Sequence, residues 1–194
     1  MFKFCSNLMT YKLKGKHMKI VKLFMILSVL GIGLVATVMY SGIVDVAADE
    51  PHSDLVYWLL EETRESSIKK SAQAIKVPDL SEPELLLSGG VDYEFMCSAC
   101  HLKPGQTESD MSVGLYPAPP NLTVPDKTFE DQEYGDEAQT NRKSFWVIKH
   151  GIKASGMPAW GKTHDDERIW AMVAFIKMLP TLTPEQYQVL TAIE

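Results

Sequence analysis

Polar and apolar residues follow different patterns in three parts of the 194-residue chain. The first 22 residues are rich in lysine, whereas residues 23–44 are an unbroken run of uncharged and mostly apolar positions. A helix of 22 such residues is long enough to cross the hydrocarbon core of a bilayer, which is about 30 Å thick. After residue 45, apolar positions recur at helical spacing and strand patterns are sparse. The sequence therefore predicts one transmembrane helix followed by an all-α domain.

The lysine-rich flank predicts the orientation of the apolar segment. Residues 1–22 hold six lysines and no acidic residue, and such flanks stay in the cytoplasm. Everything after residue 45 is then expected on the far side of the membrane. A cleaved signal peptide is the alternative, because Val46-Ala47-Ala48 offers small residues for a cut, and Met18 would also make a conventional start. The apolar run is longer than a typical signal-peptide core, which favours an uncleaved anchor.

The first predicted helix beyond the anchor covers residues 53–75. Ser53 or Asp54 can cap this amphipathic helix, and one of its faces should begin with Leu55, Trp58, Leu59, Glu62 and Thr63. It is expected to end before Val77-Pro78, since a residue that precedes proline avoids the helical conformation.

Further helices are expected along the rest of the chain. Ser81 and Glu84 form a capping-box pattern that should open the second helix. Residues 103–139 contain several prolines and glycines and are expected to be irregular. Three helices should follow over residues 140–150, 165–179 and 183–194, the last with Pro184 at its first position.

Charge is distributed unevenly along the chain. Because all six lysines of residues 1–22 lie before the apolar run, residues 23–194 carry 13 basic and 25 acidic residues, a formal charge of −12. This net negative charge argues against nucleic acid as a partner and favours electrostatic attraction of a basic protein. The charge could equally serve only to keep an exported domain soluble.

The sequence Cys97-Ser98-Ala99-Cys100-His101 carries the most specific chemistry of the chain. Two thiols three positions apart, followed at once by a histidine, form the attachment signature of c-type haem. The two cysteines would bond the porphyrin, and the histidine would supply the proximal iron ligand. A redox-active dithiol normally lies in a strand–helix context that is missing here, and a structural zinc site needs four ligands. Covalently bound haem c, one per chain, is therefore the favoured interpretation.

A six-coordinate haem needs a second axial ligand opposite His101, and methionine is the ligand that raises the reduction potential. Met157 is the favoured candidate, because it lies between Gly156 and Pro158, which allow close backbone approach and a stiff loop. It follows His101 by 56 residues, enough chain to wrap around the cofactor. His150, His164 or an open site are the alternatives.

Taken together, these residues resemble the class I (monohaem, His/Met) cytochromes c, in a membrane-anchored bacterial form. The resemblance covers roughly residues 83–180. Gly89 and Tyr93 match the glycine and the aromatic residue of the family's first helix, and Phe175 matches the aromatic residue of its last core helix. The resemblance implies that these two helices cross at Gly89. It also implies that the Pro120 carbonyl accepts a hydrogen bond from His101 Nδ1, although Pro119 stands where the family usually has glycine.

The residue patterns and the resemblance together predict four segments: a cytoplasmic segment (1–22), the anchor (23–44), a hinge with an amphipathic helix (45–80) and a cytochrome c domain (81–194). The amphipathic helix has no counterpart in the minimal fold and could be a spacer or dock a membrane complex. The implied function is a one-electron carrier rather than an enzyme, placed on the periplasmic face of the bacterial inner membrane. Its implied partners are a quinol-oxidising complex as donor and a terminal oxidase as acceptor. A haem enzyme, a gas sensor or a fixed subunit of a larger oxidoreductase are the alternatives.

Overall fold

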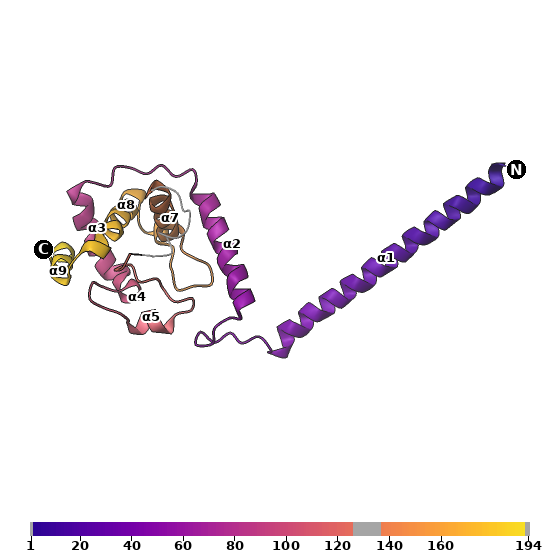
Figure 1. Cartoon of the computed structure of the whole chain (residues 1–194), viewed down its shortest axis with the longest axis horizontal. Coiled ribbons are helices and arrows are strands. Elements are labelled where there is room, and N and C mark those ends of the chain that lie inside the picture. The colour runs from indigo at the N-terminus through magenta and orange to yellow at the C-terminus, as the bar shows by residue number, and fades with distance from the viewer. Residues whose placement is uncertain (1, 126–136, 193–194) are drawn as a thin grey trace. The chain divides into compact units, whose positions relative to one another are not determined.

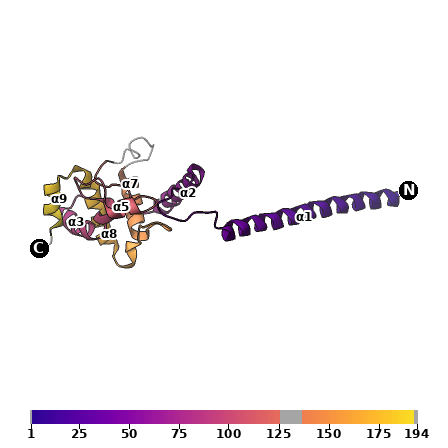
Figure 2. The same ribbon diagram turned by 90° about the horizontal axis from the view of Figure 1, so that it is seen from below.

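The computed structural model describes residues 2–125 and 137–192, with side chains from residue 17 onward in these ranges. The chain divides into two compact units, residues 1–47 and 48–194. Figures 1 and 2 show the first unit as a single helix and the second as a bundle of short helices and loops.

The first unit consists of helix α1, Phe2–Ser41. Its part from His17 to Ser41 contains an 18-residue stretch with a mean hydropathy of 2.3 and is long and apolar enough to cross a membrane. The helix ends three residues before the predicted limit of the apolar run, and it extends without a break through the lysine-rich residues.

The second unit contains seven α-helices and two short 3₁₀ helices within the described residues. They are α2 (Asp54–Ala72), α3 (Pro83–Met96), α4 (Ser98–His101), α5 (Asp110–Gly114), α7 (Glu137–His150), η1 (Trp160–Lys162), α8 (Asp166–Met178), η2 (Leu179–Thr181) and α9 (Pro184–Thr191). No strand occurs in the ranges that the structure describes, which confirms the predicted all-α class.

The core forms where α3 crosses α8, and glycine makes this crossing possible. A Cβ atom added at Gly89 would lie 2.0 Å from the carbonyl oxygen of Ala171, so no larger residue fits between the two backbones. Tyr93 and Phe175, both fully buried, pack beside this contact with ring centroids 5.5 Å apart. The crossing implied by the family resemblance is therefore confirmed.

A second cluster of buried side chains joins α7 to the other face of α8. Phe145 stacks on Trp170 with ring centroids 4.2 Å apart. An ion pair also ties α3 to α8: Arg168 donates from Nε and Nη2 to the carboxylate of Asp92 at 2.6 and 2.5 Å. Asp92 is buried, so this pair is part of the packing between the two helices.

One predicted helix start is corrected by the structure. Helix α3 begins at Pro83 with Glu82 at the cap position, and the Ser81–Glu84 capping box is wrong. The reason is that Pro83 presets the first helical residue, and the residue before a proline avoids the helical conformation. Ser81 instead bonds the side chain of Asp79 through its amide and its hydroxyl, at 3.0 and 2.7 Å. At α2, Ser53 occupies the cap position without a side-chain cap bond.

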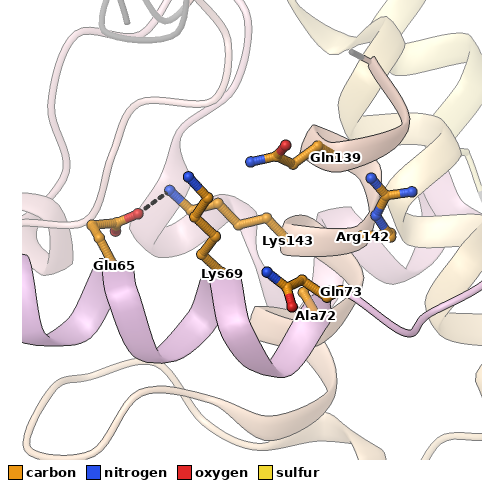
Figure 3. Close-up of a pocket in the computed structure, with 7 residues that line it drawn as sticks. All are labelled: Glu65, Lys69, Ala72, Gln73, Gln139, Arg142 and Lys143. Atoms are coloured by element: carbon orange, nitrogen blue, oxygen red, sulfur yellow. Dashed lines mark hydrogen bonds and ion pairs between the residues drawn. The ribbon is translucent and has the colours of Figure 1, made fainter. Parts of the chain in front are cut away.

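Helix α2 contacts the rest of the domain through its second half, and not through the residues that were predicted to begin one face. Ile68 and Ala72 in its second half are buried, whereas Leu55 is 65% exposed. Figure 3 shows the side chains of this half beside those of α7, around a small pocket, with Glu65 paired to Lys143 at 2.5 Å. The helix ends at Ala72, three residues before the predicted end.

The remaining helices follow the sequence closely. Asp165 caps α8, and Thr183 with Gln186 forms the predicted capping box of α9. Helix α7 begins at Glu137 rather than at residue 140 and ends at His150, before Gly151 with φ +65°. The predicted irregular region contains the short helix α5, and its residues 126–136 lie outside the described part of the chain.

Candidate functional site

The end of α3 and the single turn of α4 bring Cys97, Cys100 and His101 together. Helix α3 ends at Met96, and the Cys97 amide still donates to the Tyr93 carbonyl at 2.9 Å. The amides of Cys100 and His101 then donate to the Cys97 carbonyl at 3.1 and 2.8 Å. One turn of backbone therefore presents two thiols and an imidazole in sequence, as haem attachment requires.

The imidazole of His101 is oriented by the loop that holds Pro120. Its Nδ1 lies 2.8 Å from the Pro120 carbonyl oxygen, which can only accept a hydrogen bond. Burial lowers the pKa of His101, and this effect is stronger than the opposing effect of the Pro120 hydrogen bond. A neutral ring whose Nδ1 carries the proton keeps the lone pair of Nε2 available for iron.

The backbone of His101 is held from two sides. The Tyr93 hydroxyl, which is buried, donates to the Leu102 carbonyl at 2.7 Å and lies 3.2 Å from the His101 carbonyl. From the Pro120 loop, the Leu122 amide donates to the same His101 carbonyl at 3.2 Å. Leu102 has a φ of 73°, an uncommon conformation for leucine, and its backbone turns sharply there out of α4.

The environment of the two thiols argues against a redox-active dithiol. Cys97 is 6% exposed and packs with Tyr93 and Phe175. Burial is the main reason that the pKa of Cys97 rises to about 12, whereas reactive dithiols need an exposed thiol with a lowered pKa. Cys97 and Cys100 form no disulfide. Within the described ranges, no three histidine, cysteine or acidic side chains converge as a metal site.

Met157 lies in the loop that joins α7 to η1, and local contacts hold this loop. The Met157 amide donates to Ser155 Oγ at 3.1 Å, and its carbonyl accepts from the Ile152 amide at 3.2 Å. A Cβ atom at Gly151 would lie 2.7 Å from that same carbonyl, so the loop packs against the end of α7. Gly156 lies against the side chain of Leu115. The position of Met157 opposite His101 stays a prediction.

The two alternative histidines have partners of their own. The ring of His150, which is exposed, lies beside Trp146 with centroids 5.0 Å apart. His164 Nδ1 lies 2.8 Å from the hydroxyl oxygen of its neighbour Thr163, and its ring meets Trp160 edge-on.

Several groups that support the site were not predicted from the sequence. The Tyr93 hydroxyl and the Leu122 amide, which hold His101, are two of them. A third is Glu94, whose carboxylate accepts from the Tyr187 hydroxyl at 2.6 Å and pairs with Lys103. These contacts join residues up to 93 positions apart, and no local pattern marks them.

Residues 84–176 match the family described as "Cytochrome C oxidase, cbb3-type, subunit III". The match supports a class I cytochrome c domain in this part of the chain. The matched range of the cytochrome c domain runs from the first turn of α3 into α8 and contains Cys97, Cys100, His101 and Met157. No curated protein matches the chain. Because cytochrome c domains transfer electrons through haem, the family match supports haem c as the cofactor.

Proposed function

We propose that this cytochrome c domain is a one-electron carrier with one haem c, bonded to Cys97 and Cys100 and ligated by His101 and Met157. The observation that carries the proposal is the 2.8 Å contact between His101 Nδ1 and the Pro120 carbonyl oxygen. This contact fixes the ring and leaves only Nε2 to bind iron. The buried Cys97 and the one-turn spacing of Cys100 and His101 agree with the same assignment.

A haem with both axial positions filled changes between Fe(II) and Fe(III) without binding a substrate. The protein groups determine how well this works. The Pro120 hydrogen bond makes His101 a stronger ligand, and a Met157 thioether would raise the reduction potential. The aromatic cluster of Tyr93, Phe175 and Tyr187 shields the attachment turn from water.

We further propose that α1 anchors the carrier in the bacterial inner membrane, with the haem domain in the periplasm. The apolar part of α1 and the lysines before it support this topology. An anchor raises the effective concentration of the domain near other membrane proteins. A quinol-oxidising complex and a terminal oxidase are the proposed donor and acceptor. The family description names an oxidase subunit, so a fixed position in such a complex is the second candidate.

Substitution of Met157 tests the carrier function directly. The oxidised wild-type protein should show the absorption band of methionine-ligated haem, and its reduced form should not bind carbon monoxide at neutral pH. Met157→Leu should lose this band and bind carbon monoxide, because leucine has no sulfur to offer the iron. Met111→Leu is the matched control, since Met111 is 48% exposed in the short helix α5, and it should leave both properties unchanged.

Two results would contradict the assignment. A band that persists in Met157→Leu would exclude Met157 as the ligand. A wild-type protein without the band, and with tight carbon monoxide binding, would favour a haem enzyme or gas sensor over a carrier.

A further inference from the structure

The first two turns of α2 are apolar on every side and lie in solvent. Six consecutive apolar residues occur here, and their exposed fractions range from 41% to 65%: Leu55, Val56, Tyr57, Trp58, Leu59 and Leu60. Since successive residues of a helix point about 100° apart, six in a row cover its whole circumference. Exposed apolar surface of this kind marks a contact with another apolar phase. We call residues 55–60 the apolar tip.

The other half of α2 attaches the helix to the domain. Ile68 and Ala72 are buried there, and Glu65 pairs with Lys143 of α7 at 2.5 Å. Figure 3 shows Glu65, Ala72 and Lys143 around the pocket between the two helices. The polar residues begin directly after the tip, at Glu61 and Glu62. The domain therefore holds α2 by its second half and leaves the apolar tip uncovered.

The length of the linker limits the distance between the tip and the end of α1. Helix α1 ends at Ser41 and α2 begins at Asp54, so 12 residues join them, with a reach of at most roughly 40 Å. The last part of this linker is bound to the domain. The His52 amide donates to the Tyr116 hydroxyl oxygen at 3.1 Å, and the two rings meet edge-on with centroids 5.2 Å apart. If α1 spans a membrane, the tip cannot move far from its surface.

We infer that the apolar tip lies in the interfacial layer of the same bilayer that α1 spans, which rests on the proposed anchoring. Tryptophan and tyrosine prefer this layer, and Trp58 and Tyr57 are flanked by four aliphatic residues that can enter the acyl boundary. A protein groove would be recognised by one apolar stripe that continues for several turns. The tip is apolar all round and only two turns long, which suits a lipid surface better. The contact would hold the haem domain against the membrane.

Spin labels on the full-length holoprotein test this inference. Cys5→Ser removes the thiol outside the haem site, and Leu60→Cys then places one nitroxide on the tip. Leu87→Cys on α3 is the matched control, because Leu87 and Leu60 are 54% and 55% exposed. In vesicles of phosphatidylethanolamine and phosphatidylglycerol, the position-60 label should collide with oxygen several-fold more, and with a nickel chelate several-fold less, than the position-87 label. The haem spectrum of each variant reports that the domain is intact.

The possible outcomes separate the inference from the proposed anchor. Equal accessibility of the two labels to the nickel chelate would overturn the lipid contact. Protection of position 60 from both oxygen and nickel would also overturn it, and would indicate a protein contact such as a second copy or a fixed complex. Flotation of the same vesicles tests the anchor alone, because protein that does not float with the lipid would contradict the membrane-spanning role of α1.

Discussion

At Gly89, one missing methyl group decides whether the two main core helices can approach each other. An added Cβ would lie 2.0 Å from the carbonyl oxygen of Ala171 and 2.5 Å from its carbon, and both atoms are backbone. A flexible side chain cannot move aside here, so the helices themselves must separate. We expect Gly89→Ala to lower the free energy of unfolding of the holoprotein by about 1–3 kcal/mol or more, measured by denaturant titration.

Gly114 provides the control for this substitution. It ends the exposed helix α5, and no atom lies within 4 Å of the position its Cβ would take. Gly114→Ala should therefore leave the stability unchanged or raise it slightly, since alanine restricts the unfolded chain. Equal effects of the two alanines would show that Gly89 is not needed for close packing.

Single residues of the site differ in how far the sequence reveals them. Cys97, Cys100 and His101 are adjacent in the chain, so their spacing alone predicts the chemistry. The family resemblance predicted the helix crossing at Gly89 and the hydrogen bond from His101 to the Pro120 carbonyl. The structure confirms both contacts. The hydrogen bond from the Tyr93 hydroxyl to Leu102 was not predicted, because it depends on the unusual φ of 73° after α4.

Between elements, the ion pair of Asp92 and Arg168 joins α3 to α8 beside the glycine contact. Asp92 is 6% exposed and accepts two hydrogen bonds from the guanidinium, whereas the Arg168 side chain is 51% exposed. Removal of the arginine leaves a buried carboxylate without its hydrogen-bond partner. The resulting loss of folding free energy is larger than the net stabilisation that the intact ion pair provides. We expect Arg168→Gln to lower the free energy of unfolding by about 1–3 kcal/mol, measured by denaturant titration.

Lys149→Gln is the matched substitution at an exposed ion pair. Its partner Asp166 is 60% exposed, and water replaces a lost contact at such a site. This variant should unfold close to the wild-type midpoint. If the two glutamines destabilised the protein equally, the burial of Asp92 would have no part in holding α3 on α8.

The start of a helix was predictable from the sequence where the capping residue and the residues of the first turn indicate the same position. The start of α9 was predicted correctly from Thr183, Pro184 and Gln186, because the proline directly follows the capping residue. At α3, the same preference of proline for the first position overrode the serine two residues earlier. The face of α2 could not be read from periodicity, since residues 55–60 are apolar on every side. Its contact with α7 depends on Ile68 and Ala72 farther along.

For the whole molecule, the charge of residues 23–194 predicts how the proposed carrier would meet a redox partner. A formal charge of −12 attracts a basic redox protein over a distance set by the ionic strength, about 30 Å at 0.01 M and 8 Å at 0.15 M. The experiment uses the reduced full-length protein in neutral detergent as electron donor and a basic cytochrome as acceptor. We expect the second-order rate constant of electron transfer to fall about tenfold or more as the ionic strength rises across this range. Stopped-flow absorbance measures this rate. An acidic acceptor is the control, and its rate should rise with salt because screening then removes a repulsion. A rate that stays constant for both acceptors would mean that the acidic surface keeps the domain soluble and does not guide its encounters.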